Sequence, residues 1–165
     1  MDSGAPARRV VVLGVGNLIM GDEGVGVRCV QRLEAEGALP PDTVILDGGT
    51  STHELLGDLE DLDLLVIVDA VATGGAPGSL VRLEGDAIPS ILSNTLSPHQ
   101  HGIHDLLGTL QLLGRAPKRV VLVGVTPLRM TLSLELSPEV AAALPELAAR
   151  VCAEVKRPEM TLGGV

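Results

Sequence analysis

The chain has 165 residues, 45% of them apolar, and its 12 Lys and Arg residues against 21 Asp and Glu residues give a formal net charge of −9. This length is enough to bury one core but leaves little room for two. The acidic balance disfavours phosphate backbones and anionic lipid headgroups, and the absence of Phe, Tyr and Trp removes the stacking platforms of single-strand binders. We expect a single domain over residues 1–165, with flexible tails at 1–8 and 157–165, that binds neither nucleic acid nor membrane.

Two further features concern the compartment. No apolar run reaches the roughly 18 residues of a membrane span, and the start MDSGAPARR lacks the apolar stretch of a secretory signal. Cys29 and Cys152 form no CxxC pair or metal-type cluster, so we expect them to be small buried apolar residues on helices. These features predict a reduced, cytoplasmic protein.

The first half of the chain alternates strand and helix patterns. Residues 9–14 (RVVVLG) have the β-branched composition of a buried strand. A turn leads into a predicted helix over residues 23–36, with Asp22 as its N-cap. Residues 43–47 form a second strand, followed by a turn and a short helix. The uninterrupted apolar run in residues 62–70 predicts a third strand, at the centre of the sheet and covered on both faces.

The second half continues the alternation. After TGGAPG, the segment SLVRLEG predicts a shorter strand, followed by an irregular stretch through Asn94. Apolar residues at helical spacing predict a helix over residues 102–113, and residues 119–125 form another buried strand. Apolar and polar residues alternate over 130–136, a period of two that predicts a half-exposed edge strand. A last helix spans residues 140–155.

This order of elements determines the expected fold class. Strands that alternate with helices imply right-handed crossovers between parallel strands. We therefore predict an α/β fold, a three-layer α/β/α sandwich around a mostly parallel twisted sheet of about five or six strands with an antiparallel edge strand.

Three potential metal ligands fall where such a fold brings them to one rim of the sheet. Glu23 follows the first strand through the turn GNLIMGD, Asp69 closes the apolar run LLVIV, and His99 lies in the loop SPHQHG before the helix over 102–113. In open α/β sheets, ligands bind beyond the carboxyl ends of the strands. One imidazole and two carboxylates form a mixed nitrogen and oxygen site suited to nickel or zinc, with positions left for water or substrate.

The acids also have structural interpretations. Asp22 and Glu23 can both stabilise a helix N-terminus. For Glu23 a second interpretation is open, because the small residues next to it would let its carboxylate face a cleft. Asp69 has a stronger functional case, since a carboxylate after so apolar a run is costly to desolvate unless a metal, an Arg or helix N–H groups pair with it. Asp47, in DGGT, fits an Asx-type turn.

Two other kinds of site are disfavoured. GVGNLIMGDEGVG follows a strand and precedes a helix, but the third glycine of a dinucleotide fingerprint is replaced by Ile19. Asp22 and Glu23 would also repel a pyrophosphate at the helix start. A serine or cysteine nucleophile is disfavoured because the chain has no GxSxG elbow and neither cysteine has a neighbouring base in sequence.

Together, the motifs resemble those of the hydrogenase maturation endopeptidases, the proteases that trim the large subunit of nickel-iron hydrogenases. The resemblance covers about residues 9–155 and rests on an ordered set of segments: GVGNLIMGDEGVG, VDAV, GGAPG, SPHQHGIHDLL, LVGVTP and LSLELSPEV. It implies a peptidase of aspartyl type that removes the C-terminal extension of a nickel-iron hydrogenase large-subunit precursor after nickel insertion. The alternative is a nickel-dependent maturation chaperone that binds the precursor without cleaving it.

The resemblance also implies roles for individual residues. Glu23, Asp69 and His99 would recognise nickel already installed in the precursor, and His99 is chosen over His101 and His104 because it occupies the histidine of an S-x-H-x-x-G pattern. No cofactor is then permanently bound: nickel is presented by the substrate, and a surrogate divalent metal can occupy the site. For hydrolysis, the routes left open are a metal that polarises the carbonyl or activates water, and Asp69 or Glu23 as a base.

Overall fold

The computed structural model describes residues 7–49, 53–92 and 98–158, without the side chains of residues 53, 90–92 and 98–101. Within these residues the strands are β1 (Val10–Val15), β2 (Val44–Gly49), β3 (Leu64–Ala70), β4 (Leu80–Glu84) and β5 (Arg119–Val125). The helices are η1 (Gly21–Gly24), α1 (Val25–Glu36), η2 (His53–Leu59), α2 (Ala87–Leu92), α3 (Pro98–Leu112) and α4 (Pro138–Lys156). No helix of the described part is both long and apolar enough to cross a bilayer.

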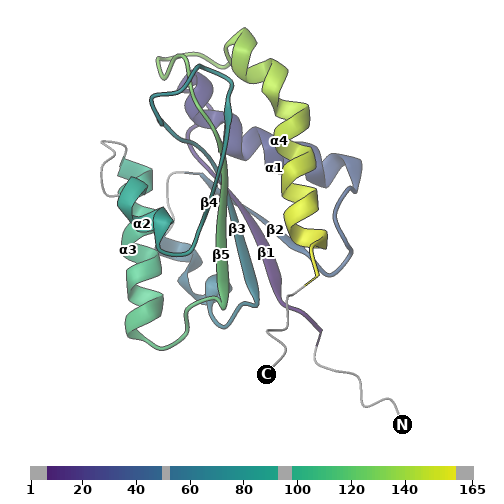
Figure 1. The fold of residues 1–165 in the computed structure, drawn as a ribbon, viewed down its shortest axis with the longest axis vertical. Coiled ribbons are helices and arrows are strands. Elements are labelled where there is room, and N and C mark those ends of the chain that lie inside the picture. Colours follow the sequence, from purple (N-terminus) through teal and green to yellow (C-terminus); the bar gives the residue numbers. More distant parts are fainter. Residues whose placement is uncertain (1–6, 50–52, 93–97, 159–165) are drawn as a thin grey trace.

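The strands form one sheet in the order β2-β1-β3-β5-β4. Neighbouring strands are parallel except for β4, which is antiparallel to β5. Figure 1 shows α1 and α4 on one side of the sheet, and α2 and α3 on the other. The predicted three-layer α/β/α class is therefore confirmed, and β3 is the central strand, buried along its whole length.

The core consists of two apolar layers that the sheet separates. Val66 and Val68 of β3 belong to the cluster that includes residues of α1 and α4, whereas Leu65 and Ile67 belong to the cluster that includes residues of α3. Because both faces are covered, successive residues of a strand are all apolar. The free thiol Cys29 is buried in the first layer, as predicted, whereas Cys152 is only partly buried and packs against that layer.

Helix α1 approaches the sheet closely at Gly26. A Cβ atom there would lie 2.1 Å from the carbonyl oxygen of Val68 and 2.5 Å from that of Val15. Only glycine therefore lets the start of α1 lie against the carboxyl ends of β1 and β3. In a dinucleotide fingerprint the third glycine allows this close packing of helix and strand. Here Gly26, further along the chain, allows it.

Two expectations about the segment before β5 were wrong. Helix α3 begins at Pro98 rather than at residue 102, so His99 lies in the first turn of a helix and not in the preceding loop. Proline suits this position because its missing N–H has no intrahelical partner in a first turn. The stretch expected to be irregular contains helix α2, and Asn94 lies outside the described residues.

The antiparallel edge strand is β4, and the prediction of an edge strand over residues 130–136 was wrong. That segment makes a single isolated bridge, between Met20 and Ser133. Its backbone pairs with the turn before α1: Gly21 N–H donates to Ser133 O at 2.9 Å, and Ser133 N–H donates to Ile19 O at 2.9 Å. The segment is exposed from Met130 to Glu135, apolar and polar residues alike, and the strand that pairs with β5 at this edge of the sheet is β4.

Candidate active site

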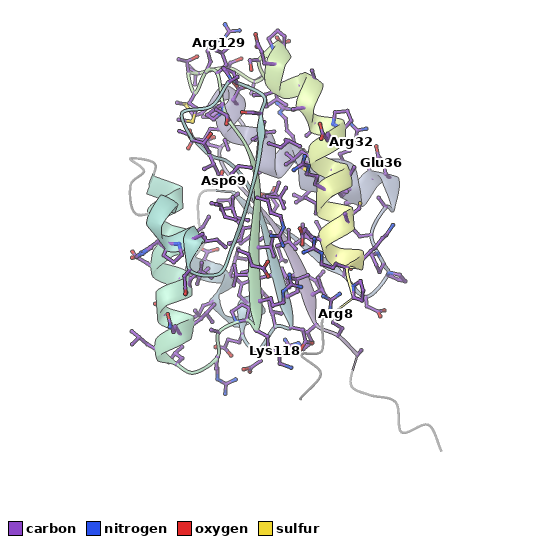
Figure 2. The ribbon with its side chains drawn as sticks, viewed as in Figure 1. Arg8, Arg32, Glu36, Asp69, Lys118 and Arg129 are labelled. Carbon is purple, nitrogen blue, oxygen red and sulfur yellow. The ribbon has the colours of Figure 1, made fainter. Side chains whose placement is uncertain are left out.

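Glu23 and Asp69 lie at the same edge of the sheet. Strands β1, β3 and β5 are parallel, so their carboxyl ends share one edge. Asp69 is the penultimate residue of β3, and Glu23 is in η1, which follows β1 and contacts β3. In Figure 2, Asp69 lies in the half of the molecule that holds Arg129, away from Lys118.

The Asp69 side chain is fully buried. Its neighbours two residues away, Ile67 and Val71, belong to the cluster that includes residues of α3, so the alternation of a strand places Asp69 on the sheet face that α3 covers. Its Oδ1 accepts a hydrogen bond from the Ala70 N–H at 2.8 Å. A carboxylate enclosed by such an apolar strand is costly to desolvate, which favours a functional role over a merely solvated one.

The first turn of α3, which contains the His99 backbone, lies at the level of this edge. The other end of α3 lies by the start of β3, where Asp61 N–H donates to Arg115 O and Lys118 N–H donates to Leu62 O. A helix of 15 residues is about 22 Å long and a strand of seven residues about 23 Å, so the start of α3 reaches the level of the carboxyl ends. The side chains of His99 and His101 lie outside the described set.

His104, the remaining histidine of this segment, has an exposed side chain. Its relative accessibility is 43%, and its Nδ1 lies 3.9 Å from Oδ1 of the still more exposed Asp105. His104 lies in the second turn of α3, at the surface of the protein.

The backbone of Glu23 is held by the end of β1. Gly16 has a φ of 134°, and a Cβ atom there would lie 1.9 Å from the Glu23 carbonyl oxygen. Both the dihedral angle and the contact require glycine. The Glu23 residue is half-buried, and its backbone N–H donates to Met20 O at 3.2 Å. The turn GNLIMGDE therefore presents Glu23 from a constrained backbone.

Asp22 does not cap a helix, contrary to the sequence prediction. The N-caps of η1 and α1 are Met20 and Gly24, and neither makes a side-chain capping bond. Instead, the fully buried Asp22 carboxylate accepts hydrogen bonds from the N–H groups of Leu128, Arg129 and Ser137 at 2.7–2.9 Å, and from the Ser137 hydroxyl at 2.8 Å.

These bonds determine the charge state of Asp22. Burial raises the pKa of this carboxyl, but the hydrogen bonds from Arg129, Ser137 and Leu128 outweigh burial and leave the pKa below its ordinary value. The carboxylate is therefore ionised and joins the turn before α1 to the segment between β5 and α4. Sequence reasoning missed this role because the partners lie more than 100 positions away, with no local signal.

A group of hydroxyls lies at the same edge. Thr73 Oγ1 is 3.0 Å from Thr126 Oγ1, and the Ser79 hydroxyl donates to Thr126 Oγ1 at 3.2 Å. The N–H of Gly78 donates to Thr126 O at 2.8 Å. These contacts hold the GGAPG turn, which follows β3, against the end of β5.

The arrangement provides two acidic residues and a helix start at one edge. Among the side chains that the structure describes, which exclude His99, no three His, Cys, Asp or Glu residues form a metal-binding group. Carboxylates can ligate a divalent cation or accept a proton from water. The site is thus suited to hydrolytic chemistry.

Comparisons with known proteins agree with this geometry. A family model described as hydrogenase maturation protease matches residues 27–154. The hydrogenase 2 maturation protease of Escherichia coli K12 is 41% identical over 149 residues, which are 90% of this chain and 91% of that protein.

Solved structures show the same relationship. The hydrogenase maturating endopeptidase HybD from E. coli superposes with a TM-score of 0.84 at 40% identity, covering 89% of this chain and 91% of that one. The nickel-iron hydrogenase maturation protease HybD from Thermococcus kodakarensis superposes with a TM-score of 0.76 at 28% identity, covering 90% and 99%. The chain therefore belongs to the hydrogenase maturation protease family and is a peptidase.

Proposed function

We propose that this peptidase removes the C-terminal extension of a nickel-iron hydrogenase large-subunit precursor after nickel insertion, with the nickel of the precursor as the recognition signal. The names of the relatives support a hydrogenase precursor as substrate. The observation that supports the site most directly is a fully buried Asp69 at the sheet edge where η1, with Glu23, contacts β3. In this proposal the enzyme is a carboxylate-based, aspartyl-type peptidase of the cytoplasm, where free Cys29 and Cys152 stay reduced.

The proposed recognition depends on charge. Glu23 and Asp69 at one edge repel each other and any anionic segment of the precursor unless a cation lies between them. Nickel that is already bound in the precursor supplies that cation, and His99 adds a nitrogen ligand of a type that nickel accepts. A precursor without nickel lacks this attraction and is released uncut. Nickel is thus part of the substrate and not a resident cofactor.

Incubation with nickel-loaded and nickel-free precursor tests the proposal, with the mass of each precursor measured by mass spectrometry. Loss of a C-terminal peptide from the loaded form alone supports it. Equal cleavage of both forms contradicts nickel recognition. Stable association without a mass change would favour the chaperone alternative, which the similarity to proteases disfavours.

Single substitutions test the assigned residues. We expect Glu23→Gln, Asp69→Asn and His99→Ala each to lower cleavage of the nickel-loaded precursor by about a hundredfold or more, while the melting temperature stays close to that of the wild type. His104→Ala is the matched control and should leave cleavage unchanged, because that side chain is exposed. Loss of cleavage in His104→Ala but not in His99→Ala would contradict the histidine assignment.

The same variants separate the two hydrolytic routes. If Asp69 is the base, Asp69→Asn should bind the loaded precursor with unchanged Kd and fail to cleave it. If Asp69 only contacts the metal, binding and cleavage should weaken together. A parallel measurement on Glu23→Gln decides the same question for Glu23.

A further inference from the structure

Exposed apolar side chains lie on the segment between β5 and α4 and on the turn before α1 that pairs with it. We call this group the apolar loop surface. It consists of Ile19, Leu128, Met130, Leu132 and Leu134. The relative accessibility of these residues ranges from 44% at Met130 to 79% at Leu132. Isolated exposed apolar residues are common on proteins, but five on one short segment and the turn that pairs with it indicate an interaction surface.

The backbone beneath this surface is fixed. The segment pairs with the turn before α1 through Ser133, whose N–H donates to Ile19 O and whose carbonyl accepts from Gly21 N–H. Asp22 N–H donates to Arg129 O at 2.9 Å, while the Asp22 carboxylate binds the segment at both ends. Arg28 of α1 also donates to Leu134 O. A rigid backbone presents side chains to a partner with a small loss of conformational entropy.

The apolar loop surface adjoins the candidate active site. Asp22, which binds the segment, is the residue immediately before Glu23. The segment itself follows the end of β5, at the edge that Asp69 also occupies. In Figure 1 the green segment after β5 lies near the purple η1, and Figure 2 labels Arg129 at that end of the molecule.

We propose that the apolar loop surface docks the hydrogenase precursor, by contact with an apolar segment of that polypeptide close to the bond that is cleaved. This inference rests on the proposed function. The substrate of a peptidase is a polypeptide that must lie against the active-site edge, and this surface borders that edge. Arg129 and Glu135, which belong to the same segment, are also exposed and supply polar groups of the kind that accompany the apolar centre of protein interfaces. A few central apolar anchors account for most of the affinity at such interfaces.

Steady-state cleavage of the nickel-loaded precursor tests the docking. The variant is Met130→Ser combined with Leu132→Ser. The control is Leu112→Ser, because Leu112 has a relative accessibility of 90% at the end of α3, on the opposite edge of the sheet. We expect the double variant to raise KM by about tenfold with little change in kcat, and to raise the Kd for the precursor in parallel. The control should keep wild-type values.

Three outcomes would overturn the docking. One is a wild-type KM in the double variant, and another is an equal rise in KM for Leu112→Ser. The third is a wild-type dimer in analytical ultracentrifugation that becomes monomeric in the double variant, since a second copy would then cover the surface. If the proposed function itself were wrong, the wild-type protein would leave the nickel-loaded precursor intact. The Kd of wild type and double variant for that intact precursor would still test the docking.

Discussion

Replacement of Asp22 by Asn tests whether the buried carboxylate stabilises the fold through the segment between β5 and α4. The substitution preserves shape but replaces one acceptor oxygen by an amide that only donates. If the amide nitrogen takes the place of Oδ1, it faces the Ser137 N–H; if it takes the place of Oδ2, it faces the N–H groups of Leu128 and Arg129 and the Ser137 hydroxyl. Either orientation leaves at least one backbone donor without an acceptor.

The expected cost follows from the number of lost bonds. An unsatisfied buried donor costs about 1–3 kcal/mol, and a hydrogen bond to a charged acceptor contributes about 1.5–3 kcal/mol. We therefore expect Asp22→Asn to lower the free energy of unfolding by about 2–4 kcal/mol. For a chain of this size, each kcal/mol corresponds to about 2–4 °C, so the melting temperature should fall by about 5–15 °C.

The assay must avoid intrinsic fluorescence, since the chain has no Phe, Tyr or Trp. Differential scanning calorimetry gives the melting temperature, and urea unfolding followed by far-ultraviolet circular dichroism gives the free energy. Asp58→Asn is the matched control, because Asp58 is exposed at the end of η2. A melting temperature of Asp22→Asn equal to that of this control would refute the reasoning.

Three other predictions follow from the packing and the charges. Gly26→Ala should lower the melting temperature by more than Gly108→Ala, because a Cβ at Gly26 overlaps the Val68 carbonyl oxygen whereas Gly108 has open space around it; equal effects would contradict the close approach of α1. Burial raises the pKa of the Cys29 thiol to about 12, so iodoacetamide at neutral pH should label Cys29 only after denaturation, as measured by peptide mass spectrometry. Hydrogen bonds from the Arg9 N–H and from Lys118 hold the pKa of Asp63 below its ordinary value. The ionised Asp63 therefore contributes fully to the free energy of unfolding above that ordinary pKa, and this contribution is lost as pH falls through the lower pKa of the folded state. The calorimetric difference between wild type and Asp63→Asn should therefore disappear in acid, and a difference independent of pH would contradict this assignment.

Local patterns in the chain were sufficient for the architecture. The run at β3 has apolar residues on both faces, which is possible only for a strand covered on both sides, and this placed it at the centre of the sheet. Parallel strands joined by helices have their carboxyl ends at one edge, so the positions of Glu23 after its strand and of Asp69 at the end of its strand already predicted that they share it. The ligand roles of these two residues and of His99 stay predictions.

Only the tertiary structure decided which distant segments pair with each other. The alternation over residues 130–136 predicted a half-exposed edge strand, but residues 130–135 are all exposed. The strand that pairs with β5 at the edge of the sheet is β4. Asp22 precedes a helix and therefore looked like a cap, yet its carboxylate binds amides near Ser137. Periodicity and capping signals describe the surroundings of a residue within a few positions, whereas hydrogen-bond partners across the chain are chosen by the packing of whole elements.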